Sequence, residues 1–287
     1  MQIGFIGAGK MAQAIIKGLV LNKVVDSDDI IVNDVSIDTL SEIKTTYNVN
    51  VTMQKKEILR FSDVVILAVK PQQMKEVIDD IKAEIKIFDN NTIFVSIAAG
   101  ITIESLEKMF YINDSVNVGN LSLENYEDDY QFKIVRTMPN MPASVGAGMT
   151  GMAINKNVKF SDIDKVLKIF NSFGKVEIVE EKLMDAVVAL SGSSPAYMYL
   201  ILDAMATAAQ KEGMKKEVAL KFAAQAMIGS GKVILEQRAD TEQLIKDVCS
   251  PGGTTIEAID VLEDNNVRDI FIEAMEACIE KSKKLCS

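Results

Sequence analysis

The chain has 287 residues, enough for two domains, and 48% of them are hydrophobic, so each domain can bury a core. Its net charge of −10 argues against a nucleic-acid partner, because nucleic-acid phosphates would be repelled. The sequence contains no histidine, which removes the usual general base and the commonest metal ligand, and we expect no metal site.

The start, "MQIGFIG", enters an apolar strand without a basic leader. The nearest approach to a membrane span, "AYMYLILDAMATAA", carries Asp203 in its middle. We therefore expect a cytoplasmic protein that does not cross a membrane.

Strands and helices alternate through the first half of the chain. Strands are expected at 2–6, 29–34, 63–70, 91–100 and 132–138, and helices at 10–22, 37–47 and 71–85. This alternation is typical of a parallel doubly wound sheet of the α/β class, the Rossmann fold, and we assign it to a dinucleotide-binding domain at 1–158. The polar, acidic segment 111–130 is expected to be an exposed loop or hairpin, and no function is assigned to it.

The second half, 159–287, reads as an all-α domain, broken only by one strand at 175–179. A long helix is expected to begin at Ser194 and Pro195 and to stop at Gly213. The next helix carries small residues that permit close approach of a neighbouring helix, namely Ala223, Ala224, Ala226, Gly229 and Gly231. Because these helices are apolar around much of their circumference, we predict that they form an interface with a second copy of the chain.

The first strand leads into a glycine loop, Gly7-Ala8-Gly9-Lys10-Met11-Ala12, which fits the pattern G-x-G-x-x-G/A. Such a loop holds a pyrophosphate at the N-terminus of the following helix. A plain structural turn is the alternative, but the preceding strand, the following helix and an acidic residue at the end of the second strand favour a dinucleotide.

That acidic residue is Asp34. Its carboxylate can accept hydrogen bonds from both hydroxyls of an adenine ribose and would repel a 2′-phosphate. No arginine lies nearby, and Ser36 is the only small donor compatible with a phosphate. Asp34 therefore favours NADH over NADPH, while a solvated turn residue remains the alternative. Two further strand ends, Ala68-Val69-Lys70-Pro71 and Ala98-Ala99-Gly100, carry small or bendable residues that let a ligand touch the backbone.

A second candidate site lies near the end of the chain, where "SPGGTTIEAIDVLE" (250–263) runs from a glycine turn into an amphipathic helix. Free N–H groups at Gly252, Gly253 and Thr254, together with the helix dipole, suit a small carboxylate. A simple helix cap by Ser250 or Thr254 is the alternative, but a cap does not require two glycines followed by two threonines.

Seven segments in order resemble the pyrroline-5-carboxylate reductase family. They are "GFIGAGKMA", "LAVKPQ", "SIAAGI", "RTMPNMPA", "LSGSSPAYMY", "KFAAQAM" and "VCSPGGTTIEAIDVLE". The resemblance implies a Rossmann domain followed by a helical dimerisation domain that interlocks with its partner, and dimers that can assemble into decamers. It implies hydride transfer from NAD(P)H to the C=N carbon of 1-pyrroline-5-carboxylate, giving L-proline in the last step of proline biosynthesis.

The resemblance also implies roles for individual residues. The cofactor would lie against Gly7, Ala8, Gly9, Lys10, Met11, Asp34, Ser36, Ala68, Val69, Lys70, Pro71, Ala98 and Ala99. The substrate, which has a carboxylate and a cyclic imine, would lie against Glu181, Val248, Ser250, Gly252, Gly253, Thr254 and Thr255. The Thr255 hydroxyl would be the catalytic group and hydrogen-bond the ring nitrogen. Many relatives carry an arginine after the second strand, whereas this chain reads "NDVS", so the preference for NADPH does not transfer directly.

Two other classes of protein share parts of this pattern. A β-hydroxyacid dehydrogenase has the same N-terminal layout but needs a catalytic lysine on the interdomain helix, where this chain reads "LSGSSPAYMYLILDAM". A non-catalytic dinucleotide sensor would keep the first glycine loop but has no use for "PGGTT". Substrate turnover separates the sensor from the reductase.

Overall fold

The structure is a computed structural model of the chain that describes residues 1–85, 91–110, 132–237 and 240–286. The expected acidic loop at 111–130 lies outside these residues. The chain divides into two compact units, one of Met1–Gly192 with Ile279–Ser287 and one of Ser193–Cys278.

The first unit is built on one sheet, whose described strands number eight and lie in the order β3-β2-β1-β4-β5-β6-β7-β8. The strands are β1 (Ile3–Ile6), β2 (Ile30–Asn33), β3 (Asn50–Thr52), β4 (Val64–Leu67), β5 (Ile93–Ser96), β6 (Lys133–Met138), β7 (Gly148–Ile154) and β8 (Gly174–Ile178). Neighbouring strands are parallel except for β6 and β7. Residues 139–147 hold only the short 3₁₀ turn η4 (Met141–Val145), too little for a crossover, so the chain reverses there.

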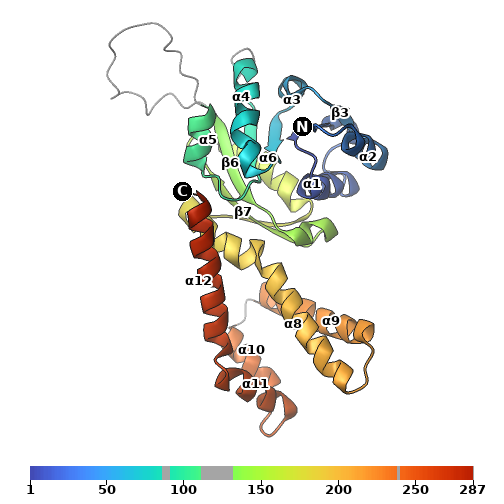
Figure 1. Cartoon of the computed structure of the whole chain (residues 1–287), viewed down its shortest axis with the longest axis vertical. Coiled ribbons are helices and arrows are strands. Elements are labelled where there is room, and N and C mark those ends of the chain that lie inside the picture. Colours follow the sequence, from blue (N-terminus) through green and yellow to red (C-terminus); the bar gives the residue numbers. More distant parts are fainter. Residues whose placement is uncertain (86–90, 111–131, 238–239, 287) are drawn as a thin grey trace, which may run out of the picture. The chain divides into compact units, whose positions relative to one another are not determined.

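Helices cover both faces of this sheet (Figure 1). One face carries α1 (Lys10–Leu21), α2 (Ile37–Tyr47) and α6 (Phe160–Asn171), and the other carries α3 (Lys55–Phe61), α4 (Met74–Ile85) and α5 (Ile103–Phe110). Successive side chains of a strand point to opposite faces, so Ile3 and Phe5 pack in the core under α1 while Ile6 packs in the core under α4. The predicted α/β Rossmann fold is confirmed.

The remaining described elements of this unit are short. They are the 3₁₀ turns η1 (Ser27–Asp29), η2 (Pro71–Gln73) and η5 (Glu181–Leu183), the helix α7 (Met184–Val187) and the π-helical turn η6 (Val188–Gly192).

Several elements differ from the sequence-based expectation. The elements β3, α3, α5 and β7 were not among those expected, and β7 makes the sheet mixed rather than wholly parallel. The expected domain boundary at 158/159 falls inside the first compact unit, because β8 pairs with β7 and the apolar face of α6 packs in the sheet's core.

The second unit is helical, as predicted. It contains α8 (Ser194–Lys211), α9 (Lys216–Gln237), α10 (Thr241–Val248), α11 (Thr254–Asp264) and α12 (Val267–Cys286) as far as Cys278. The expected start of α8 is confirmed, with Pro195 in its first turn. Gly213 has φ +89°, a left-handed conformation that suits the position just after a helix end.

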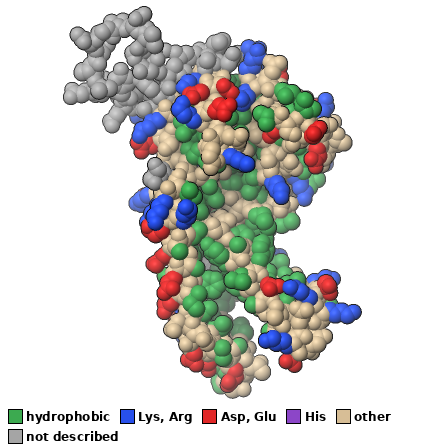
Figure 2. Space-filling view, viewed as in Figure 1, with side chains coloured by type: hydrophobic (Ala, Val, Ile, Leu, Met, Phe, Trp, Pro, Cys, Tyr) green, Lys and Arg blue, Asp and Glu red, His purple; other side chains and the backbone are tan. Residues whose placement is uncertain are grey.

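Large apolar side chains are exposed over the helices of this unit (Figure 2). Leu200 of α8, Phe222 of α9 and Leu235 of α9 are 74%, 69% and 78% exposed. One described helix, α9, also has the length and mean hydropathy (1.3) of a membrane span, which by itself is weak evidence for one.

Candidate active site

Four strand ends expected to hold the cofactor lie side by side. The sheet order places β2, β1, β4 and β5 next to one another, and Ile6 pairs with both Asn33 and Leu67, while Leu67 pairs with Ser96. The loops that follow these residues therefore start from the same edge of the sheet. This is the carboxyl edge, where open α/β sheets bind their ligands.

The glycine loop follows β1 at this edge. Gly7 has φ +99°, and a Cβ there would lie 2.6 Å from the carbonyl oxygen of Ala68, so the close approach of β1 and β4 requires glycine. Gly9 is the N-cap residue of α1, and no side chain caps this helix. A Cβ at Gly9 would meet no atom within 4 Å. The loop thus presents an uncapped, open helix N-terminus, which is suited to an anionic phosphate.

Asp34 connects the glycine loop to the next helix. One carboxylate oxygen, Oδ2, accepts the backbone N–H of Ala8 at 2.8 Å, and Oδ1 accepts that of Ser36 at 2.9 Å. The Ser36 Oγ in turn accepts the N–H of Thr39 and caps α2. Asp34 is therefore more than a solvated turn residue, because it fixes the loop at Ala8 and the start of α2 in one arrangement.

The other two strand ends have small side chains at this edge. Ala68 donates its N–H to the carbonyl of Ile6 at 2.8 Å, and Pro71 begins η2. Ala98 is buried and donates its N–H to the Ser96 Oγ at 3.3 Å. Gly100 has φ +78°, which allows the turn that leads into α5.

The C-terminal loop lies in the second unit. Gly252 has φ +68°, and the Gly253 N–H donates to the carbonyl of Ser250 at 3.0 Å. Gly253 is the N-cap residue of α11, and no side chain caps that helix. The Gly253 N–H, which was expected to bind the substrate, is therefore already hydrogen-bonded within the turn. The first N–H groups of α11, beginning at Thr254, have no side-chain cap and lie at the positive end of the helix dipole. Val248 is the last residue of α10 and is exposed.

Glu181 has different neighbours from those expected. Its Oε1 accepts the backbone N–H of Ile103 at 2.6 Å and lies 3.0 Å from Nη1 of Arg136, whose side chain is 5% exposed. Arg136 is a residue that the sequence analysis missed. The only hint in the sequence is a charge inside the apolar strand "FKIVRTM".

A small cluster of polar side chains lies at the start of α8. Cys278 Sγ donates to Ser193 Oγ at 3.3 Å. Burial raises the pKa of the neighbouring Tyr197 phenol, and the Cys278 thiol raises it further. These contacts join the first turn of α8 to α12 within the helical unit.

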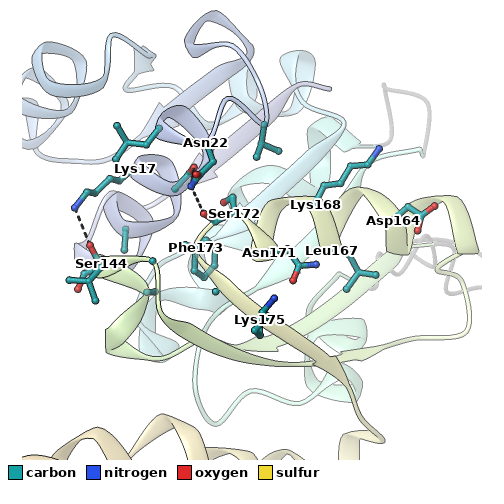
Figure 3. Close-up of a pocket in the computed structure, with 18 residues that line it drawn as sticks. Lys17, Asn22, Ser144, Asp164, Leu167, Lys168, Asn171, Ser172, Phe173 and Lys175 are labelled. Atoms are coloured by element: carbon teal, nitrogen blue, oxygen red, sulfur yellow. Dashed lines mark hydrogen bonds between the residues drawn. The ribbon is translucent and has the colours of Figure 1, made fainter. Parts of the chain in front are cut away.

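A cavity of about 970 Å³ lies elsewhere in the first unit, between α1, η4, α6 and β8 (Figure 3). Lys17 donates to the carbonyl oxygen of Ser144 at its rim, and Asn22 Nδ2 donates to that of Ser172. None of the expected site residues lines this cavity.

Comparison with known proteins covers the whole chain. Residues 181–285 match the family model described as pyrroline-5-carboxylate reductase dimerisation, and residues 2–100 match the one described as NADP oxidoreductase coenzyme F420-dependent. The chain is 39% identical to the pyrroline-5-carboxylate reductase of Escherichia coli over 99% of this chain and 98% of that protein. It is 36% identical to that of Methanosarcina acetivorans over 99% of this chain and 97% of that protein.

Solved structures agree with these relatives. A pyrroline-5-carboxylate reductase from Coxiella burnetii has a TM-score of 0.87 and 36% identity, covering 100% of this chain and 98% of that one. The pyrroline carboxylate reductase of Plasmodium falciparum, solved with NADP bound, has a TM-score of 0.82 and 30% identity, with the same coverage of both chains.

A nucleotide-binding sheet followed by a matched dimerisation domain defines an NAD(P)-dependent oxidoreductase that forms an oligomer. Within that class, the chain belongs to the pyrroline-5-carboxylate reductase family.

Proposed function

We propose that the chain reduces the C=N bond of 1-pyrroline-5-carboxylate to give L-proline, the last step of proline biosynthesis. The observation that carries this proposal is the match to reductases of this name over 99% of the chain. The uncapped N-termini of α1 and α11 support it, because the reaction needs a site for a cofactor pyrophosphate and a site for a substrate carboxylate.

The cofactor would lie along the carboxyl edge of the sheet. The first N–H groups of α1 would hold its pyrophosphate, and the small residues Ala68 and Ala98 would let it approach the backbone. When bound, NAD(P)H supplies the hydride.

The substrate would be held by the loop before α11. Its carboxylate would accept hydrogen bonds from the N–H groups of Gly252 and Thr254, with the Ser250 hydroxyl assisting. The Thr255 hydroxyl would donate a hydrogen bond to the ring nitrogen, and the proton that this nitrogen gains as the adjacent carbon gains hydride would come from water. An imine accepts hydride once its nitrogen is protonated or strongly hydrogen-bonded, so a chain without histidine can carry out this step by orientation and polarisation.

NADH is the proposed preferred cofactor. Residues 34–43 read "DVSIDTLSEI" and carry three acidic side chains and no basic one, so a 2′-phosphate would meet only negative charge in this segment. The Asp34 oxygens each retain a lone pair beyond the backbone N–H that they accept, which leaves room for ribose hydroxyls.

The oligomer proposed is an interlocked dimer formed by the helical unit, with decamers as a further assembly of dimers. The exposed apolar residues of α8 and α9 support this arrangement, because a second copy can cover them. We further propose that the enzyme acts in the cytoplasm, without nucleic-acid or membrane partners.

The test is a comparison of initial rates with 1-pyrroline-5-carboxylate and each of NADH and NADPH. Turnover with NADH favoured would support both the reaction and the role of Asp34. Turnover favouring NADPH would keep the reaction and contradict the cofactor preference. Cofactor binding without turnover of the imine would contradict the reductase and support a dinucleotide sensor.

A further inference from the structure

The loop between β5 and α5, residues 97–102, carries two of the residues proposed to line the cofactor groove, Ala98 and Ala99. It turns at Gly100, whose positive φ of +78° is a conformation that needs glycine. At the start of the loop, the Ile97 N–H donates to the Leu67 carbonyl oxygen and the Ala98 N–H donates to the Ser96 Oγ, at 3.3 Å each. The position of its far end depends on contacts at the start of α5.

Glu181 makes such a contact from a distant part of the sequence. Its Oε1 accepts the N–H of Ile103, the first residue of α5, at 2.6 Å. A carboxylate at this position also complements the positive end of the helix dipole. Thr102 supplies the local cap, because its Oγ1 accepts the N–H of Ser105 at 3.0 Å. The end of the loop is thus fixed by a cap of its own and by a side chain from η5.

Arg136 is the ion-pair partner of Glu181. It lies on β6, where it pairs with Ser96 of β5, the last residue of the strand before the loop. Its guanidinium Nη1 lies 3.0 Å from the Glu181 Oε1, and its side chain is 5% exposed. A charge this deeply buried requires a partner, so Arg136 fixes the carboxylate, which in turn fixes the loop.

The chain around Glu181 also packs against the loop and against α12. Met184 is buried in the same core as Ala98, Ile101 and Ile103. The next residue, Asp185, accepts a hydrogen bond at 2.6 Å from the hydroxyl of Ser282 on α12. One turn further along α12, the Leu285 carbonyl oxygen would lie 3.3 Å from a Cβ at Gly100, so the end of that helix rests on the turn of the loop.

We infer that Glu181 and Arg136 are a positioning pair that holds the 97–102 loop in the shape that the cofactor requires, and that Glu181 does not contact the substrate. This inference rests on the proposed cofactor groove. It replaces the substrate-contact role that the family resemblance implied for Glu181. The Glu181 carboxylate acts through the Ile103 N–H and is not a catalytic group.

The test uses three variants of the full chain. Glu181→Ala removes the acceptor for both Ile103 and Arg136, whereas Glu181→Gln keeps an oxygen that can accept both hydrogen bonds. Glu180→Ala is the matched control, because the neighbouring Glu180 pairs only with the exposed Lys182 in the contacts described. For each variant, kcat, the KM for NADH, the KM for the imine and the dissociation constant for NADH are measured at a temperature below its melting temperature. Amide hydrogen exchange is measured over a peptide containing 97–105.

We expect Glu181→Ala to raise the cofactor KM and dissociation constant about 10-fold, with kcat and the imine KM within about 2-fold of wild type, the pattern of lost cofactor binding alone. Exchange in the 97–105 peptide should become faster, since the Ile103 N–H has lost its acceptor. Glu181→Gln should recover most of both effects, and Glu180→Ala should match wild type.

Other outcomes overturn the inference. An increase in the imine KM alone would return Glu181 to the substrate site. Faster exchange with unchanged cofactor affinity would leave Glu181 as a structural anchor only, and unchanged exchange would remove the anchor as well. A wild-type chain that binds NADH but does not reduce the imine would overturn the proposed reaction. The NADH dissociation constants and the hydrogen exchange of the variants would then still test the role of Glu181 and Arg136. A wild-type chain that binds no nicotinamide cofactor would overturn both.

Discussion

In the proposed reaction, single residues would set the chemistry at the uncapped N-termini of two helices, α1 and α11. At α1 the important side chain is Asp34, whose two oxygens accept the N–H groups of Ala8 and Ser36. At α11 it is the Thr255 hydroxyl, in the first turn of the helix. Under the proposal Asp34 acts on the cofactor and Thr255 on the imine, so substitutions at the two residues should affect different kinetic constants.

Replacing Thr255 should impair the chemical step. Thr255→Val keeps the shape of the side chain but removes the hydroxyl proposed to donate to the imine nitrogen. We expect kcat to fall about 10- to 100-fold, the effect of losing one positioned polar group. Thr255→Ser keeps the hydroxyl and should retain most of the activity. Steady-state rates with saturating cofactor measure both, and unchanged kinetics in Thr255→Val would remove Thr255 from the mechanism.

Replacing Asp34 should change the choice of cofactor. Asp34→Ala removes the acceptor proposed for the ribose hydroxyls and the acceptor for the Ala8 N–H. We expect the KM for NADH to rise about 10-fold, equivalent to about 1.4 kcal/mol, while kcat/KM for NADPH falls less because a repulsive charge is lost too. Asp28→Ala, which removes an exposed charge just before the start of β2, at the other end of that strand from Asp34, serves as the control. An equal fall in kcat/KM for both cofactors would contradict the role of Asp34 in selection.

Among the elements, β6 and α6 are joined by a buried ion pair. Lys133 of β6 lies 3.0 Å from Asp162 of α6, and the Asp162 Oδ2 also accepts the N–H of Lys159 at the helix start. Burial raises the pKa of the Asp162 carboxyl, but the hydrogen bonds from the Lys159 backbone and the Lys133 side chain, with the charges of Lys133 and Lys165, outweigh it, so the pKa lies below its ordinary value. A carboxyl with a depressed pKa stabilises the fold above the pKa of an unfolded aspartate, about 3.9, and loses that contribution as the pH falls through the lower folded value.

Removing this carboxylate should destabilise the first unit. Asp162→Asn leaves Lys133 buried without its counter-charge, and we expect the free energy of unfolding at pH 7 to fall by about 3 kcal/mol. The difference from wild type should shrink as the pH drops below about 4, because the unfolded wild-type chain takes up a proton at Asp162 there while the folded carboxyl, with its lower pKa, stays ionised to lower pH. Urea unfolding from pH 7 to pH 3 measures it. Asp164→Asn, at an exposed position on the same helix, should change stability by less than about 0.5 kcal/mol, and an equal loss in both variants would contradict the role of the pair.

Sequence patterns predicted the apolar strands and the longer helices of the sheet and missed the short elements β3, α3 and α5 and the irregular strand β7. The strands β1, β2, β4 and β5 are mostly apolar runs, so their existence was predictable, and β6 was predicted although it carries Lys133 and Arg136. The strand β7, "GMTGMAI", has two glycines and no alternation of apolar and polar residues, and its antiparallel pairing depends on the short connection through η4. The contact between Arg136 and Glu181 joins residues 45 apart in sequence, and no local pattern specifies it.

For the whole molecule, the helical unit does not bury its own apolar surface. The residues buried in α8 and α9 are the alanines Ala206, Ala219 and Ala223, whereas large side chains such as Leu200 and Phe222 are exposed. Exposed apolar surface of this extent favours association, because removing it from water is the main driving force for burial. The match to a dimerisation domain over 181–285 supports the proposal that a second copy of the chain covers this surface.

A charge in this surface should therefore dissociate the oligomer. Phe222→Glu would place a carboxylate on the apolar face of α9, where an interface could not solvate it, and we expect the mass measured by light scattering to fall to that of a monomer at micromolar concentration. Activity should fall with it, because the loop before α11 belongs to the same helical unit and would lose the packing that fixes it. Lys44→Glu, an exposed charge reversal on α2 of the nucleotide-binding unit, should keep both mass and activity. If Phe222→Glu kept the oligomer intact, α9 would lie outside the interface, and the dimer would have to form through other helices of the unit.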